Sequence, residues 1–366
     1  MKKIMYIAPA LPVGGAEKFL IFLVNSLSKT TTIQTVVSLS DNNILAKEID
    51  PSIELVSIPR KSKLSFDSLR SLRHLIDQKK PDIIFCLNFF SYFFLRTATL
   101  NFKLKSTIYI SYHSTVHLTR KEDLLHKVYI SMLRKNDVVV MVSQKQANYT
   151  AQQYNLNKNQ ITTILNGVNT DFWKLPGEFF DKALLLKQHS IPAGSKVIIL
   201  VAAFRAEKNH LGAVRALVKM HAAHNNKAYL LFVGHGLLMD EVKKKVSEAK
   251  MDEYIKFAGL QSDLRPFYWS SDLFTLTSTN VETFSVAALE AMSCGLPAVL
   301  TDIGGASEMI DPKINGLLTD TSDESIAAAW NKALSGSYSN ETIHKYIDTN
   351  FGAEKMTTNY QKMMGI

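Results

Sequence analysis

Short apolar runs alternate with amphipathic stretches along most of the 366-residue chain. Short apolar runs are typical of buried strands, and apolar residues at helical spacing are typical of helices that cover a sheet. The alternation predicts an α/β protein with parallel sheets. The predicted strands are residues 3–8, 33–39, 53–58, 83–87, 107–112, 138–142 and 161–165 in the first half, and 197–202, 229–233, 255–257, 273–276 and 298–300 in the second.

The pattern divides into two halves, each of which predicts a doubly wound domain. Prolines and glycines gather between them in residues 171–194. We therefore expect an N-terminal domain over residues 1–175 and a C-terminal domain over residues 190–345. The last stretch, 346–366, carries aromatic and methionine residues at helical spacing, which predicts an amphipathic helix.

The segment 280–302, NVETFSVAALEAMSCGLPAVLTD, predicts a loop, a helix and a buried strand in close succession. Thr283 or Ser285 can cap the helix, because a short side-chain oxygen accepts an unpaired N–H group of the first turn. Gly295 suits a left-handed helix end, and Pro297 prevents its continuation. The segment is the most informative part of the sequence, because it also carries two carboxylates.

The first turn of this predicted helix, Phe284, Ser285 and Val286, offers backbone N–H groups at the positive end of the helix dipole, which favours a phosphate. Glu282 and Glu290 are eight residues apart, or roughly 12 Å at helical rise. A diphosphate at this turn would therefore have a carboxylate on either side. One carboxylate could accept hydrogen bonds from a ribose and the other could meet hydroxyls beyond the second phosphate. This is the length of a nucleotide-sugar.

The E-x7-E pattern, the CGLPAV strand after it and the segment Gly304–Glu308, GG-x-x-E, resemble the donor-site signature of the family 4 retaining glycosyltransferases. The resemblance spans nearly the whole chain. It implies a GT-B fold, in which two Rossmann-like domains face each other across a cleft and a last helix returns to the first domain. It also implies an acceptor-binding N-terminal domain, a donor-binding C-terminal domain, and transfer on one face of the sugar without a covalent nucleophile.

Two cations follow the predicted strand 197–202. Arg205 and Lys208 stand three residues apart and can converge on one diphosphate. Cations fixed there would stabilise the departing nucleotide, which gains negative charge in the transition state. They resemble the family's Arg/Lys pair with one departure, because many members place the arginine at the position of Ala203.

Gly14 and Gly15 follow the first strand, and they let the backbone approach a ligand at a helix start. The sequence there lacks the G-x-G-x-x-G fingerprint, which disfavours a nicotinamide dehydrogenase. The segment resembles the family's glycine loop, which faces the donor phosphates and sugar, and Glu17 could then face the acceptor. His113, at the end of strand 107–112, resembles the histidine set beside the transferred sugar, with His117 as a weaker neighbour.

Further loops match the cleft of the resembled family. The backbone around Leu260 would meet the edge of the base. Gly234-His235-Gly236 ends another strand of the same domain, and Asn166-Gly167-Val168-Asn169 resembles the family's NGVD turn.

The formal net charge is +9, which is compatible with an anionic membrane or with nucleic acid. Much of the basicity lies in residues 60–80, where Leu69, Leu72 and Leu75 recur at helical spacing. This stretch predicts either a solvated helix face or a membrane-docking patch. No nucleic-acid motif accompanies the charge, so we expect no nucleic-acid partner. The N-terminus suits a first strand better than a signal peptide, and we expect a cytoplasmic protein, with docking at the inner face of the membrane left open.

Cys86 and Cys294 have no zinc or disulfide spacing and are predicted to be small buried residues. No Asp-x-Asp element lies at a suitable strand end, so we expect no obligatory metal or cofactor other than the nucleotide-sugar. Cations and helix N–H groups would then meet the diphosphate charge.

Together these features favour a retaining transferase that moves a hexose-type sugar from a nucleoside-diphosphate sugar, with UDP preferred. The acceptor would be lipid-linked or a polysaccharide in surface glycan biosynthesis. Two alternatives remain open at this level, a nucleotide-sugar hydrolase or epimerase and a non-catalytic binding subunit. The predicted catalytic residues are His113, Arg205, Lys208 and Glu282, and the predicted donor-binding residues are Gly14, Gly15, Arg205, Lys208, Leu260, Phe284, Ser285, Val286 and Glu290.

Overall fold

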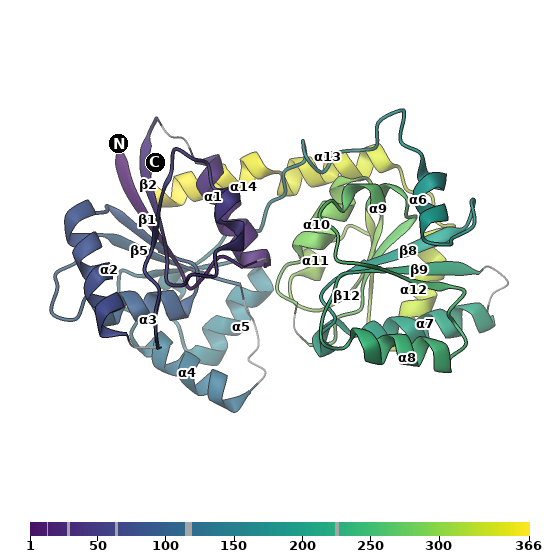
Figure 1. The fold of residues 1–366 in the computed structure, drawn as a ribbon, viewed down its shortest axis with the longest axis horizontal. Helices are drawn as coiled ribbons and strands as arrows, with labels where there is room; N and C mark the ends of the chain where they lie inside the picture. The colour runs from purple at the N-terminus through teal and green to yellow at the C-terminus, as the bar shows by residue number, and fades with distance from the viewer. Residues whose placement is uncertain (13, 28–29, 63–64, 114–118, 224–226, 281) are drawn as a thin grey trace. The chain divides into compact units, whose positions relative to one another are not determined.

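The computed structural model describes residues 1–12, 14–27, 30–62, 65–113, 119–223, 227–280 and 282–366 (Figure 1). His117 and part of the basic stretch therefore lie outside the described residues. The chain divides into two compact units. The first unit is Met1–Asn166 with Met356–Ile366, and the second unit is Gly167–Lys355. The change of unit at Asn166 precedes the predicted linker of residues 171–194.

The first unit contains a seven-stranded parallel sheet in the order β3-β2-β1-β4-β5-β6-β7. Alternate residues of β1 enter the two cores of this unit: Ile4 and Tyr6 pack with α1 and α14, whereas Met5 and Ile7 pack with α2, α3 and α4. The strands are β1 (Lys2–Ala8), β2 (Thr32–Ser38), β3 (Glu54–Ser57), β4 (Ile83–Cys86), β5 (Thr107–Tyr112), β6 (Val138–Met141) and β7 (Ile161–Thr163), and the helices are α1 (Gly15–Ser26), α2 (Phe66–Lys79), α3 (Phe89–Ala98), α4 (Arg120–Ser131), α5 (Gln144–Tyr154) and α14 (Ala353–Met364).

The second unit contains a six-stranded parallel sheet in the order β10-β9-β8-β11-β12-β13. The sequence pattern missed β13, because its four residues, Gly-Leu-Leu-Thr, contain an apolar run of only two. The strands are β8 (Lys196–Val201), β9 (Ala228–Val233), β10 (Ile255–Gly259), β11 (Leu273–Leu276), β12 (Ala298–Thr301) and β13 (Gly316–Thr319), and the helices are α6 (Lys182–Gln188), α7 (His210–Ala223), α8 (Met239–Glu248), α9 (Arg265–Trp269), α10 (Val286–Ser293), α11 (Ala306–Met309), α12 (Asp323–Ser335) and α13 (Asn340–Phe351).

In both units the chain forms a central strand first, then adds strands on one side of it, and then adds the remaining strands on the other side. The order therefore reverses between β1 and β4 in the first unit and between β8 and β11 in the second. Ligands of doubly wound sheets bind outside the carboxyl ends of the strands at this switch point. The loops after β8 and β11 are thus the first place to look for a site in the second unit.

The prediction of one terminal helix over residues 346–366 is wrong in its extent. The structure has two helices there, α13 and α14, which are separated at Gly352. The Val168 N–H group donates to the Phe351 carbonyl oxygen, and the Ala353 N–H group donates to the Val168 carbonyl oxygen, each at 2.9 Å. These strand-like bonds replace helical ones, and Gly352 has extended backbone angles. As a result α13 belongs to the second unit, while the buried Tyr360 of α14 lies in a core of the first.

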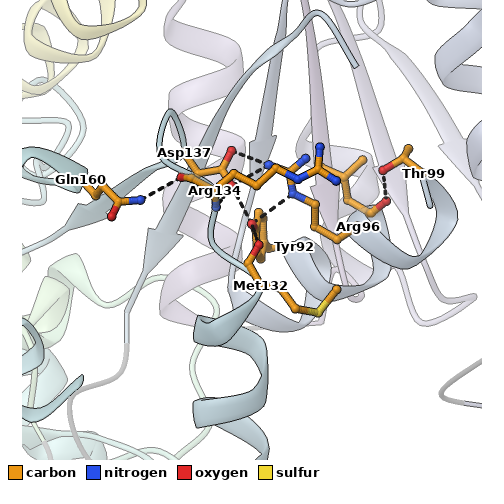
Figure 2. Close-up of polar contacts among 8 residues, drawn as sticks. Tyr92, Arg96, Thr99, Met132, Arg134, Asp137 and Gln160 are labelled. Carbon is orange, nitrogen blue, oxygen red and sulfur yellow. Dashed lines mark hydrogen bonds and ion pairs between the residues drawn. The ribbon is translucent and has the colours of Figure 1, made fainter. Parts of the chain in front are cut away.

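A buried ionic network joins α3 to the loop before β6 (Figure 2). The Arg96 guanidinium contacts both carboxylate oxygens of Asp137, and its Nε donates to the Tyr92 hydroxyl at 3.0 Å. That hydroxyl lies 2.6 Å from Asp137 Oδ2 and from the Met132 carbonyl oxygen. The Arg134 N–H group donates to the same Asp137 oxygen at 2.8 Å. Asp137 precedes β6, so the network lies at the amino ends of the strands and away from the switch point.

Candidate functional site

Lys208 and Glu282 meet at the switch point of the second unit. Lys208 ends a 3-10 turn, Ala206–Lys208, after β8, and Glu282 follows β11. The Lys208 Nζ lies 2.6 Å from Glu282 Oε2, and the Ser278 hydroxyl donates to the same oxygen at 3.2 Å. Thr277 holds the backbone at the lysine, because its hydroxyl lies 3.1 Å from the Lys208 carbonyl oxygen and 3.0 Å from the Asn209 carbonyl oxygen. Both charged side chains remain partly exposed, at 23% and 14%, so each can reach a ligand.

Arg205 does not share this arrangement. Its side chain is 70% exposed, and its ion-pair partner is Glu207, at 3.9 Å between Arg205 Nη1 and Glu207 Oε1. Arg205 is the extended residue that precedes the 3-10 turn, whereas Lys208 lies at its end. The structure therefore brings Lys208 to the carboxylate predicted for the site and leaves Arg205 largely in solvent.

The helix predicted after Glu282 is α10. Of the two predicted caps, Ser285 is the one used, because its hydroxyl accepts the Ala288 N–H group at 3.2 Å. Gly295 has a φ of +84°, as the predicted left-handed helix end requires. The Phe284 side chain is 4% exposed and packs 5.8 Å from the Phe351 ring, so only its backbone can serve a ligand.

Glu290 lies on α10 and is only 7% exposed. The hydroxyl of Tyr268, on α9, lies 3.4 Å from Glu290 Oε2. Nothing in the sequence marks Tyr268 as a site residue, since an aromatic residue in an apolar pattern normally indicates a core position. The contact between the Tyr268 hydroxyl and Glu290 depends on how α9 and α10 pack, so it cannot be predicted from the sequence.

Gly304 packs directly against the backbone of Glu282, a contact that the sequence alone does not reveal. Its φ is +56°, and a Cβ atom there would overlap the carbonyl oxygen of Glu282. The adjacent Gly305 N–H group donates to the Thr283 carbonyl oxygen at 2.8 Å. The glycines of the GG-x-x-E segment thus let one loop pass directly against the backbone that carries the carboxylate.

The loops that follow β8, β9 and β10 are bonded to one another at the same edge of the sheet. The Phe204 N–H group donates to the His235 carbonyl oxygen at 3.2 Å, and the Gly234 N–H group donates to the Gly259 carbonyl oxygen at 2.8 Å. Leu260 comes next and is 78% exposed. Its backbone is therefore placed after a strand end, as the predicted base contact requires.

The predicted residues of the first unit also follow strand ends. Gly14 precedes α1, and a Cβ atom there would overlap a carboxylate oxygen of Glu17, which folds back over the glycine backbone. Burial raises the pKa of Glu17 above its usual range, while hydrogen bonding to its own backbone N–H opposes the shift. Gly15 is the exposed first residue of the helix. Glu17 therefore covers part of the glycine loop that the resemblance assigns to the donor.

His113 directly follows β5. Its Nε2 lies 2.8 Å from the Ser111 hydroxyl, and its ring packs 4.7 Å from the Phe19 ring. Burial lowers the pKa of His113 to about 4. The imidazole is neutral near pH 7, so it can exchange hydrogen bonds with a hydroxyl but cannot supply a positive charge.

Three other features of the described residues bear on where a ligand, a metal ion or a reactive thiol could lie. A hollow of about 290 Å³ in the second unit is lined by Lys196, Asp272 and Pro297 among others, which lie at the amino ends of the strands and away from Lys208 and Glu282. Within the described ranges no group of three or more His, Cys, Asp and Glu side chains could hold a metal ion. Cys86 and Cys294 are buried free thiols, as predicted.

Comparison with known proteins gives two family matches. Residues 13–172 match the model for "Glycosyltransferase Family 4", and residues 181–349 match the model for "Glycosyl transferases group 1". The chain belongs to the glycosyltransferases, because both of its halves match a model of that class. The predicted family and the predicted enzyme class, a glycosyltransferase, are therefore confirmed.

The relatives of this glycosyltransferase have names that refer to different biosynthetic products. It is 27% identical over 235 residues to the N-acetyl-alpha-D-glucosaminyl L-malate synthase of Bacillus anthracis, a match that covers 63% of the chain and 59% of that protein. It is 23% identical over 361 residues to the lipopolysaccharide core biosynthesis glycosyltransferase LpsE of Rhizobium meliloti, with 96% of each chain covered. The first match thus spans about three fifths of its relative.

Solved structures confirm the predicted fold class, a GT-B glycosyltransferase built from two Rossmann-like α/β domains. HepE of Anabaena, solved in complex with UDP, has a TM-score of 0.84 and 19% identity over the full length of both chains. The glycosyltransferase WaaG, involved in lipopolysaccharide biosynthesis, has a TM-score of 0.74 and 14% identity, and covers 99% of this chain.

Proposed function

We propose that this glycosyltransferase moves a hexose-type sugar from UDP-sugar to a lipid-linked or polysaccharide acceptor, with retention of anomeric configuration, in surface glycan biosynthesis. The observation that carries the proposal is the Lys208–Glu282 pair at the switch point, next to the first turn of α10. UDP is favoured because the structural neighbour HepE was solved with it. The acceptor class is favoured by the name of LpsE and by a relative from Campylobacter jejuni named for a diphospho-undecaprenol acceptor.

In this proposal the donor diphosphate displaces the carboxylate from Lys208. The lysine then contacts the phosphate that leaves, and the backbone N–H groups of Phe284, Ser285 and Val286 contribute the positive end of α10. Glu282, released from the lysine, accepts hydrogen bonds from the sugar hydroxyls. Glu290 accepts those of the ribose, and the backbone near Leu260 meets the base.

The chemical step follows from this placement of charge. The bond between the anomeric carbon and the phosphate oxygen breaks, the acceptor oxygen bonds to the same face of that carbon, and the acceptor proton passes to the departing phosphate. Lys208 stabilises the charge that develops on the phosphate, which is where a fixed cation lowers a barrier most. Arg205, with its exposed side chain, is free to turn toward the same phosphate. No obligatory metal is part of the proposal.

From the first unit, His113 is assigned to the transferred sugar and Gly14 and Gly15 to the donor. These assignments rest on the family resemblance. A neutral His113 suits a hydrogen bond to a sugar hydroxyl, since its pKa of about 4 leaves it uncharged at neutral pH.

A peripheral contact with anionic membrane at the cytoplasmic face is a further part of the proposal. Leu69 and Leu72 of α2 are buried in a core of the first unit, so they are not available to lipid. The exposed Arg70 and Arg73 and the 85% exposed Phe66 would make the contact instead. Flotation with anionic and with neutral vesicles tests this, and equal absence from both would remove the membrane contact. In the described part of the chain, no helix is long and apolar enough to span a bilayer.

The central experiment is calorimetric binding of UDP, GDP and ADP, with and without Mg²⁺, followed by turnover of UDP-sugars and determination of the product anomer by NMR. Lys208→Gln removes the cation, and Lys219→Gln is a control because Lys219 pairs with Glu324 on the surface. We expect Lys208→Gln to lower kcat/KM by about 10- to 100-fold, the value of a hydrogen bond to a charged group. Similar small losses in both variants would refute the role of Lys208, and sugar released without acceptor would indicate a hydrolase.

A further inference from the structure

Tyr268 directs its hydroxyl at α10, toward the Glu290 carboxylate and the helix backbone. The hydroxyl is 3.4 Å from Glu290 Oε2 and 3.5 Å from the Ala287 carbonyl oxygen, both on the same helix. Tyr268 is 1% exposed, so water cannot easily take the place of either acceptor. A buried hydroxyl without a partner would cost free energy, which ties this side chain to α10.

The phenol is fixed as a hydrogen-bond donor. Burial, and then the nearby Glu290 carboxylate, raise the pKa of Tyr268 well above its usual value. A protonated phenol has one hydrogen, which favours the charged acceptor over the neutral carbonyl because charge-assisted bonds are stronger. The bond is long, at 3.4 Å, and it favours the orientation in which one oxygen of Glu290 faces the phenol and the other points elsewhere.

The ring of Tyr268 is itself held in place. The Trp173 ring packs edge-on at 5.8 Å, and the backbone of Trp173 is bound to α10 because the Ser293 hydroxyl donates to its carbonyl oxygen at 2.6 Å. The next residue of α9, Trp269, donates its indole N–H to the Lys174 carbonyl oxygen at 2.8 Å. The segment around Trp173 therefore straps α9 and α10 together, and the Tyr268 hydroxyl has little freedom to leave Glu290.

We infer that Tyr268 is a positioning residue that orients the Glu290 carboxylate toward the ribose hydroxyls of the donor nucleotide and so sets discrimination between ribose and deoxyribose. The inference rests on the proposed function, in which Glu290 binds the ribose. A carboxylate accepting from two vicinal hydroxyls needs a defined orientation, and a site built to pair with a hydroxyl rejects the analogue that lacks it.

The test compares the affinities of UDP and 2′-deoxy-UDP by calorimetry in the wild type and in Tyr268→Phe, which keeps the ring and removes the hydroxyl. Tyr229→Phe is the matched control, because Tyr229 is 6% exposed in β9 of the same unit and packs on Tyr254. We expect Tyr268→Phe to weaken UDP binding about threefold to tenfold, because the lost bond is long and acts on UDP only through Glu290. Binding of 2′-deoxy-UDP should be weakened less than that of UDP in Tyr268→Phe, because only its 3′-hydroxyl remains to bond Glu290, and both affinities should be unchanged in the control.

A double-mutant cycle separates positioning from a general structural effect. If Tyr268 acts through Glu290, then adding Tyr268→Phe to Glu290→Ala causes no further loss of UDP affinity. Equal weakening of UDP and 2′-deoxy-UDP, no weakening at all, or a further loss in the Glu290→Ala background overturns the inference while the proposed function stands. A wild type that binds none of UDP, GDP and ADP refutes the proposed function together with the inference. If GDP or ADP binds instead, that nucleotide and its 2′-deoxy form replace the UDP pair.

Discussion

Replacing Asp137 with asparagine tests how strongly the first unit depends on its buried ion pair. Asp137 and Arg96 are 3% and 4% exposed, and the carboxylate has the Arg96 guanidinium, the Tyr92 hydroxyl and the Arg134 N–H group as neighbours (Figure 2). The Asp137→Asn variant would leave the Arg96 charge buried and uncompensated. Breaking a buried pair in this way costs about 3–5 kcal/mol of unfolding free energy.

The expected loss of unfolding free energy in Asp137→Asn is larger than the loss from breaking an exposed ion pair, so the two can be distinguished. The pair Lys79–Glu54, in the same unit, has 34% and 45% exposed side chains and an N–O distance of 2.6 Å. Exposed pairs contribute about 1 kcal/mol or less, so Glu54→Gln is the control. At a urea dependence of about 2 kcal/mol per molar, Asp137→Asn should lower the unfolding midpoint of the first unit by roughly 2 M.

The assay uses the distribution of tryptophan. Trp173, Trp269 and Trp330 all belong to the second unit, so tryptophan fluorescence follows that unit, whereas hydrogen exchange of β1 and β6 amides follows the first. We expect Asp137→Asn to lower protection in the first unit and to leave the fluorescence midpoint in place. A loss below about 1 kcal/mol, equal to that of the Glu54→Gln control, would refute the reasoning.

A double replacement asks whether the uncompensated charge is the cause. Arg96→Met with Asp137→Leu removes both charges, and buried pairs replaced by apolar residues are often neutral or stabilising. We expect this variant to be more stable than Asp137→Asn alone. A double variant that is less stable would place the cost in the lost hydrogen bonds of Tyr92 and Arg134.

Three further predictions concern the second unit. Gly304→Ala should displace the Glu282 backbone and abolish most turnover. The control is Gly194→Ala, at a φ of +80° with open space around it, which should cost only about 1 kcal/mol of stability and no activity. Equal activities of the two variants would contradict this prediction. Burial, and then the nearby Lys208, lower the pKa of His210 from 6.5 to about 4. The unfolded chain therefore binds the proton first, and stability should fall by roughly 3 kcal/mol as pH drops from 6.5 to 4, a slope that His210→Gln should remove from the fluorescence-monitored urea midpoint. Chelation by EDTA should leave turnover unchanged, and a loss restored by Mg²⁺ would contradict the metal-free proposal.

Local structure near the candidate site follows from the sequence because short-range chemistry decides it. Apolar runs place every strand except β13 to within a few residues. Ser285 caps α10 through an N–H group three residues away, and Gly295 ends the helix through its own φ. The spacing of Glu282 and Glu290 matches the length of a nucleotide-sugar, and the residues around them carry the resemblance to the glycosyltransferase signature. These features depend on groups only a few residues apart, so no knowledge of the fold is needed.

Contacts between distant segments were decided by the tertiary structure alone. Lys208 and Glu282 are 74 residues apart, and they meet because β8 and β11 are neighbours at the point where the strand order reverses. The same order leaves Arg205 in solvent, places the Tyr268 hydroxyl behind Glu290 and passes Gly304 beneath the Glu282 carbonyl oxygen. A spacing pattern specifies which side chains are available, whereas the strand order and the crossover helices determine which of them face one another.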